Sequence, residues 1–259
     1  MFFNCNNVSV NSNTVKVNGR KINLPSHYNS LSVINGTVYV DGVIYDGSEE
    51  VTESKRKKDM KTIDFDETII SILADYANVN VEIVNDKKSS ISYDNSEFDV
   101  NVSGGFIYIK RKVNNVTSHI TINLSKKHLS SFLNLDIEDG GNIKFESQEE
   151  LNTSLALTTV NGNIKVESNT TEDITLSCDN GNIKSNINCR ETDIRVDNGN
   201  VKGSIRVKED STIRVDNGSV KICTLSKIND RVKNGSAKLN HRRIDDSTIY
   251  VSIDKRKWT

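Results

Sequence analysis

The sequence predicts an all-β fold: a β-solenoid with about 17–21 residues in each coil, preceded by a small N-terminal β unit. Three observations predict it. An Asn-Gly motif recurs along the second half of the chain, apolar residues alternate with polar ones on both sides of it, and the step between copies is nearly constant. Alternation with a period of two is typical of half-buried β-strands. The formal net charge of −1 over 259 residues argues against a basic nucleic-acid-binding protein.

The N-terminal segment, residues 1–45, contains a duplication. Residues 7–19 match residues 30–42 at an offset of 23, and both copies alternate like strands. Residues 46–60 follow with no apolar periodicity and a run of basic residues between acidic ones, which indicates a charged linker. We therefore expect three parts: a small duplicated β unit, this linker, and a β-solenoid over residues 61–259 that ends in a capping strand.

Strands without the Asn-Gly motif are expected before the repeats. Residues 78–84, 98–102, 106–110 and 120–124 all alternate between apolar and polar side chains. Residues 69–77 could form a short helix, but their β-branched side chains favour a strand.

The repeat itself spans residues 135–239. A loose first copy, Asp139-Gly140-Gly141-Asn142, precedes five closer ones, and the aligned glycines follow one another at steps of 21, 19, 18, 19 and 17. A meander of β-hairpins could also use Asn-Gly turns, but it would not require a constant step, so we favour solenoid corners at which glycine takes a positive φ. In the first copy the alternation at Leu135 and Ile137 lies one place early, which predicts a bulge. The expected corner residues are Asn161, Gly162, Asn180, Gly181, Asn198, Gly199, Asn217, Gly218, Asn234 and Gly235.

These features give residues 61–240 a resemblance to the putative-adhesin family of bacterial proteins. The resemblance rests on the strands at 78–83, 105–111 and 120–124 and on the repeated φ-x-φ-x-Asn-Gly-Asn-φ-Lys, and it covers roughly 180 residues. It implies a right-handed β-solenoid of adhesin-like type in envelope-associated or exported proteins, with no catalytic residues to carry over.

No catalytic, cofactor or metal site is expected. Cys178 and Cys223 occupy apolar strand positions and are expected in the core, and no cysteine pair or histidine has zinc-ligand spacing. Calcium at the Asp-Asn-Gly turns is the alternative to stacked asparagine amides that hydrogen-bond along the corner, and we favour the stacked amides. The histidines are scattered at His27, His119, His128 and His241.

One lysine follows each Asn-Gly copy, so stacked coils would place these residues in a column. A column of lysines could bind an acidic partner, or it could only keep the protein soluble. The residues before the motif, Arg195 and Asp197 in one copy and Arg214 and Asp216 in the next, are expected to pair and to leave their face electrostatically quiet. The lysine column is Lys144, Lys165, Lys184, Lys202, Lys221 and Lys238.

The sequence thus favours a non-enzymatic structural or protein-binding β-solenoid that binds a protein partner or self-associates, without specific nucleic-acid binding. Two alternatives are an intracellular or viral factor that sequesters a host protein, and an enzyme that acts on a carbohydrate polymer in a solenoid groove. No apolar run is long enough for a membrane helix and no signal peptide is visible at the N-terminus. We therefore expect a cytoplasmic protein, although the resemblance implies association with the cell envelope.

Overall fold

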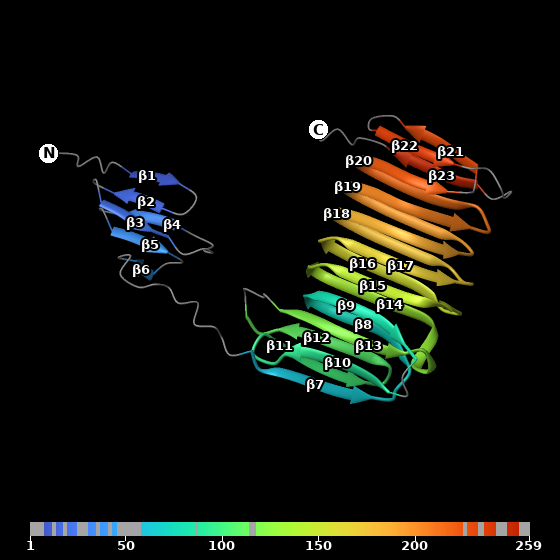
Figure 1. The fold of residues 1–259 in the computed structure, drawn as a ribbon, viewed down its shortest axis with the longest axis horizontal. Helices are drawn as coiled ribbons and strands as arrows, with labels where there is room; N and C mark the ends of the chain where they lie inside the picture. The colour runs from blue at the N-terminus through green and yellow to red at the C-terminus, as the bar shows by residue number, and fades with distance from the viewer. Residues whose placement is uncertain are drawn as a thin grey trace. The chain divides into compact units, whose positions relative to one another are not determined.

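The computed structural model divides the chain into two compact units, Met1–Lys58 and Asp59–Thr259, and each is described separately (Figure 1). Both units are all-β, and no α-helix occurs in the residues that the structure describes. Most of the expected linker, and the corner at Asn234 and Gly235, lie outside these residues. The described residues are 8–11, 14–17, 20–24, 31–34, 37–40, 43–45, 58–85, 88–113, 118–224, 227–232, 236–241 and 248–253.

The first unit repeats one three-stranded antiparallel sheet. Val8 pairs with Val17 in the first sheet and Leu31 pairs with Val40 in the second, so the offset of 23 residues in sequence is kept in the strand register. Valines from both sheets share one small core with Ile22 and Leu24. The strands are β1 (Val8–Asn11), β2 (Thr14–Val17), β3 (Arg20–Asn23), β4 (Leu31–Ile34), β5 (Thr37–Val40) and β6 (Val43–Tyr45).

The second unit contains one 17-stranded sheet and a short 3₁₀ helix at Lys126–His128. Its early strands are β7 (Met60–Phe65), β8 (Ile69–Tyr76), β9 (Asn78–Val84), β10 (Ser89–Asp94), β11 (Phe98–Ser103), β12 (Phe106–Arg111) and β13 (His119–Ser125). The strand expected over residues 69–77 is confirmed as β8. The later strands are β14 (Leu129–Gly140), β15 (Ile143–Leu151), β16 (Ser154–Asn161), β17 (Ile164–Thr170), β18 (Ile174–Cys189), β19 (Thr192–Val207), β20 (Ser211–Thr224), β21 (Lys227–Val232), β22 (Ser236–His241) and β23 (Thr248–Ile253).

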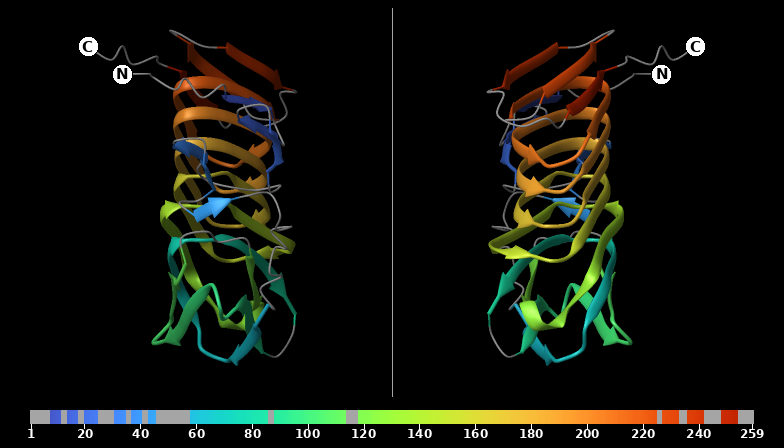
Figure 2. Two further views of the ribbon diagram at one scale, coloured as in Figure 1. Left: turned by 90° about the vertical axis from the view of Figure 1, so that its left-hand side faces the viewer. Right: turned by 90° about the vertical axis from the view of Figure 1, so that its right-hand side faces the viewer.

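Strands of successive repeats pair in parallel, which excludes a meander of antiparallel hairpins for this region. Ile183 pairs with Val201, and Val201 pairs with Val220, so each residue meets its equivalent in the next copy. Each segment that precedes an Asn-Gly motif pairs with the equivalent segments of the neighbouring copies, and we call the face formed by these segments side A. Each segment that follows a motif pairs in the same way, and we call that face side B. Figure 2 shows these strands stacked one above another.

Alternating side chains of both sides fill one core. In β19, for example, Ile194, Val196, Val201, Ile205 and Val207 are buried, whereas the charged residues Asp193, Arg195, Lys202 and Arg206 are exposed. The predicted bulge in the first copy is confirmed, because the register between β14 and β8 shifts between Ile137 and Gly140.

The early strands do not stack in chain order. On side A, β8 lies between β12 and β14, and on side B, β9 lies between β13 and β15. Below them, β10 pairs antiparallel with β7 and β13, and β11 pairs antiparallel with β12. The segment of residues 69–84 is therefore held between segments that follow it in sequence.

The last strand, β23, also lies out of chain order. β23 pairs in parallel with β20 on one side and with β21 on the other, so it lies inside the side A stack. On side B, β22 pairs directly with β20. At this end of the stack, the outermost described strand of side A is β21.

Candidate functional site: the Asn-Gly edge and side B

The Asn-Gly motifs lie where side A passes into side B, and their asparagines form two continuous rows of hydrogen bonds. In the row before the glycines, the Nδ2 of Asn198 donates to Oδ1 of Asn180 at 2.9 Å. In the row after them, the Nδ2 of Asn182 donates to Oδ1 of Asn163 at 3.0 Å. The predicted stacking of amides is thereby confirmed. The first row contains Asn161, Asn180, Asn198 and Asn217, and the second contains Asn78, Asn142, Asn163, Asn182, Asn200 and Ser219.

Asn78 is the member of these rows that the sequence analysis missed, since no glycine precedes it. A signal was available: Asn78-Val79-Asn80-Val81-Glu82 has the same pattern as the stretch 163–167, asparagine followed by two alternating apolar residues and a glutamate. Residue 77, in the place of the repeat glycine, is a buried alanine.

Close backbone approach, more than a tight turn, explains the glycines. The strand assignment runs unbroken through the motifs of β18, β19 and β20, so the backbone there is extended. A Cβ added to Gly199 would lie 1.6 Å from the carbonyl oxygen of Gly181, and Gly199 also has a φ of 152°. Gly162 has no φ in the positive range that favours glycine, yet its added Cβ would lie 1.9 Å from the oxygen of Gly141. The stacking distance therefore excludes a side chain at these positions.

The structure places all six predicted lysines in one row along side B. Lys144 pairs with Lys165, and the register continues strand by strand through Lys184, Lys202 and Lys221 to Lys238. Neighbouring strands lie about 4.8 Å apart, so the lysine side chains leave the backbone at nearly even intervals.

The first two lysines of the row are neutralised. Lys144 lies 2.7 Å from one oxygen of Glu146, and Lys165 lies 2.8 Å from the other and 3.1 Å from Glu167. Hydrogen bonds from Lys144 and then Lys165 lower the pKa of Glu146. Hydrogen bonds to Glu146 and then Glu167 raise the pKa of Lys165.

The other four lysines are exposed and have no carboxylate beside them on their strands. Two residues after each lysine, where Glu146 and Glu167 stand in the earlier copies, the later copies have Asn186, Ser204, Cys223 and Asn240. No ion pair involves these four lysines within the described part of the chain. Side B therefore changes from neutral to basic along the stack, and we call Lys184, Lys202, Lys221 and Lys238 the basic stretch.

At the other end of side B a groove of about 450 Å³ is lined by acidic side chains, among them Glu82, Glu146 and Glu149. Hydrogen bonds from Asn85 and then Lys126 lower the pKa of Glu149, as the lysines do for Glu146. Both carboxyl groups are therefore ionised at neutral pH. An ionised carboxylate cannot act as the general acid that glycoside hydrolysis needs.

Side A has the paired charges that the sequence predicts. Arg195 Nε donates to Asp197 Oδ1 at 3.1 Å, and Arg214 Nε donates to Asp216 Oδ1 at 2.9 Å. This part of side A therefore carries little uncompensated charge.

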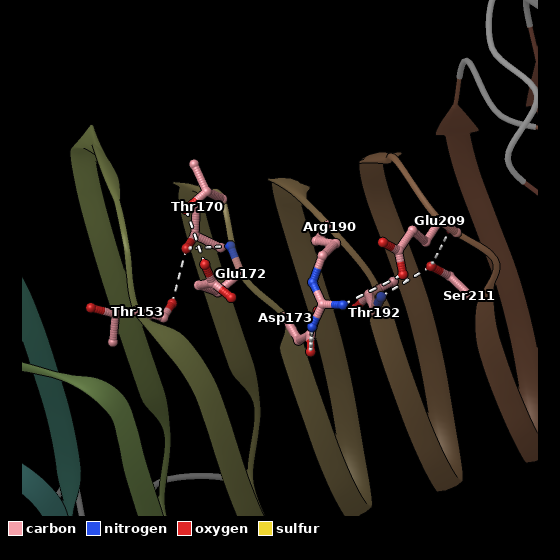
Figure 3. Close-up of polar contacts among 9 residues, drawn as sticks. Thr153, Thr170, Glu172, Asp173, Arg190, Thr192, Glu209 and Ser211 are labelled. Carbon is pink, nitrogen blue, oxygen red and sulfur yellow. Dashed lines mark hydrogen bonds and ion pairs between the residues drawn. The ribbon is translucent and has the colours of Figure 1, made fainter.

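The edge opposite the Asn-Gly motifs is tied by hydrogen bonds between successive copies (Figure 3). Thr170 Oγ1 donates to the carbonyl oxygen of Thr153 at 2.9 Å. Arg190 reaches Asp173 at 2.5 Å and Glu209 at 3.5 Å, so one guanidinium joins three consecutive levels of the stack. Because these hydrogen bonds and ion pairs join successive copies, we assign this edge to stability.

The structure corrects one cysteine assignment. Cys178 is buried as expected and lies 3.1 Å from the oxygen of Gly162, whereas Cys223 is exposed on the same outward register as Lys221. Cys189 is the second buried thiol. Burial raises the pKa of Cys178 to about 11 and that of Cys189 to about 12, so both remain protonated.

The structure describes the side chains of two of the four histidines, His119 and His128. His119 is exposed, and His128 lies 3.0 Å from the hydroxyl of Ser89. Among the described residues no three histidine, cysteine or acidic side chains are grouped to hold a metal ion. His27 lies outside those residues.

No protein-family model matches the chain, and no curated protein matches it. Solved structures give distant matches. A putative adhesin from Bacteroides fragilis is 13% identical with a TM-score of 0.39, covering 76% of this chain and 97% of that one. A putative lipid binding protein from Parabacteroides distasonis is 17% identical with a TM-score of 0.41, covering 77% and 97%. A putative cell adhesion protein from Clostridium sporogenes is 14% identical with a TM-score of 0.31, covering 76% and 100%.

Similarities at this level leave the chain without an assigned family. In the part of the chain that the structure describes, no helix has the length and apolar character needed to cross a membrane.

Proposed function

We propose that this protein is a non-enzymatic β-solenoid that holds an acidic partner protein against the basic stretch of side B. The observation that carries the proposal is the register of the lysine row, in which four successive exposed lysines have no acidic residue two places after them and make no ion pair among the described residues.

The solenoid part of the proposal rests on the parallel pairing. Equivalent residues meet at offsets of 18 or 19 from β17 to β20, as Lys184 and Lys202 do, and each copy contributes one segment to side A and one to side B. A chain that winds once around a common core in each repeat would produce this pairing.

Electrostatic addition is the physical basis for the binding face. Four unit charges in a line about 4.8 Å apart reinforce one another's potential at a partner's surface. The asparagine rows fix the strands that carry them, so little ordering of the backbone remains to be done on binding. A folded protein with several carboxylates on a flat surface would match this line.

Non-enzymatic action is part of the proposal and is supported by the acidic groove. The pKa values of Glu146 and Glu149 in this groove are lowered. A carboxyl group that donates a proton at neutral pH needs a raised pKa.

A charge-reversal experiment tests the proposal. The triple variant Lys184→Glu, Lys202→Glu and Lys221→Glu is compared with Lys61→Glu, Lys110→Glu and Lys127→Glu, which changes the net charge equally at exposed lysines outside the row. Binding to immobilised poly-L-glutamate is measured over a range of salt concentrations. We expect the first variant to lose about tenfold or more in affinity and the second to lose little.

The fold and the class of partner are controlled in the same experiment. Thermal melts of both variants should match the parent, because exposed charges contribute little to stability. Equal losses in the two variants would show that only net charge matters. Tighter binding of a single-stranded oligonucleotide of equal charge would overturn the assignment of a protein partner.

A further inference from the structure

The C-terminal strand β23 occupies a slot between two strands of the same chain. Ile213 pairs with Val251, and Val251 pairs with Asp230, so β23 has a parallel neighbour along each of its edges. Ile249, Val251 and Ile253 are fully buried or nearly so. Val251 follows Ile213 in sequence by two repeat lengths. The strand that pairs with β20 is therefore β23 and not β21, the side A strand of the sixth copy.

The sequence of β21 differs from those of the preceding side A strands at one core register position. The register position held by Leu176, Ile194 and Ile213 in successive copies is an apolar core position. In the sixth copy the equivalent residue is Asp230. A strand with aspartate at this position, stacked directly on Ile213, would bring a carboxylate to a core position and incur its desolvation cost. Val251 supplies the apolar residue instead.

Strand β23 enters the stack by interactions that do not depend on which copy of the chain supplies it. They are two parallel ladders of backbone hydrogen bonds and three apolar side chains, and a single covalent connection joins β23 to β22. We propose that the slot between β20 and β21 accepts β23 of a second copy, so that this protein forms strand-swapped oligomers. In the swapped form each slot keeps the same contacts, and only the connection between β22 and β23 changes path.

A cysteine cross-link distinguishes the two forms in the full chain. Arg214 and Ser252 are register partners on β20 and β23 with outward positions, and neighbouring strands bring Cα atoms within disulfide range. The variant Arg214→Cys, Ser252→Cys is made with Cys5→Ser and Cys223→Ser to remove other thiols outside the core. It is refolded at low-micromolar and near-millimolar concentration, oxidised, denatured and analysed on a non-reducing gel.

We expect covalent dimers and larger species at high concentration and cross-linked monomers at low concentration. The matched control, Arg195→Cys with Arg214→Cys in the same background, joins β19 to β20 in the interior of the repeats. It should give cross-linked monomers only. Monomers alone at both concentrations in the β20–β23 variant would overturn the proposal, as would equal dimer formation in the control.

A peptide experiment provides the second measurement. The full chain with Val251→Asp is predicted to lose its own strand from the slot. A labelled peptide of residues 246–254 should then bind it with a clear rise in fluorescence anisotropy, and the same peptide carrying Val251→Asp should not. If the variant keeps its native melt and binds neither peptide, the slot does not accept a strand in trans.

Discussion

The middle of the second unit and its two ends follow different stacking rules. From Ile143 to Thr224 the strands stack in the order in which the chain makes them. At one end β8 and β9 lie between segments that follow them in sequence, and at the other end β23 lies between β20 and β21. We infer that similar repeats favour stacking in chain order, whereas strands without the repeat stack by apolar complementarity.

The cause lies in the rows at the Asn-Gly edge. The copies around Gly162, Gly181 and Gly199 have an asparagine on both sides of the glycine, and these asparagines bond to their equivalents in neighbouring copies. The described residues of β23 contain no asparagine, so the strand adds no member to these rows. Aliphatic side chains that fit a core position are enough to place such a strand.

The largest expected effect in the middle comes from its glycines. Gly199→Val should destabilise the second unit by about 3 kcal/mol, because the new Cβ would collide with the carbonyl of Gly181 and φ is unfavourable. Two controls are compared with it in thermal melts. Gly162→Ala introduces a collision without an unfavourable φ, whereas Gly104→Ala places a side chain at a φ of 62° with no atom within 4 Å of the new Cβ. If Gly104→Ala costs as much as Gly162→Ala, backbone conformation outweighs the close approach.

An asparagine in the middle of a row should matter less than a glycine. Asn182→Ala removes the amide that donates to Asn163 and accepts from Asn200, which we expect to cost about 1–2 kcal/mol. Asn101→Ala, on the exposed edge strand β11, serves as the control. Equal midpoints for the two variants in urea unfolding would show that the rows do not stabilise the stack.

The end of the stack can be made more like the middle. Asp230→Val gives the sixth copy the apolar residue of its predecessors, so β21 should compete with β23 for β20. We expect amide protection of residues 248–253 to fall by about tenfold in hydrogen exchange, with β18 and β19 unchanged. Unchanged protection of β23 would show that the charge at residue 230 does not decide the order.

The smallest effect is expected from the ion pairs at the acidic end of side B. The pKa of Glu146 is lowered by Lys144 and Lys165, so its stabilising contribution is present above its unfolded pKa of about 4.5 and is lost as pH falls through the lower folded value. Glu146→Gln should reduce stability at pH 7 by about 0.5 kcal/mol and by less at pH 3. Urea midpoints across this range, with and without 1 M salt, measure the difference. A loss that is the same at both pH values would assign the effect to packing.

Much of the middle could be predicted from sequence, because its signals are local and repeated. The alternation around Ile194 and Val196, the asparagine rows and the alignment of Lys184 with Lys202 all follow from one motif at a fixed step. Cys223 shows the limit of such reasoning: the prediction that it lies in the core is wrong, because Lys221, two residues earlier on the same face of the strand, is outward.

Alternation and the constant Asn-Gly step suffice to predict an all-β protein, pairing between equivalent residues of successive repeats, and one register position for six lysines. The strand order at the two ends, the ion pairs of Lys144 and Lys165 with Glu146 and Glu167, and the position of β23 inside the stack are visible only in the folded molecule. Alternation depends on residues that are neighbours in the chain, whereas strand order depends on contacts between segments that are far apart in it.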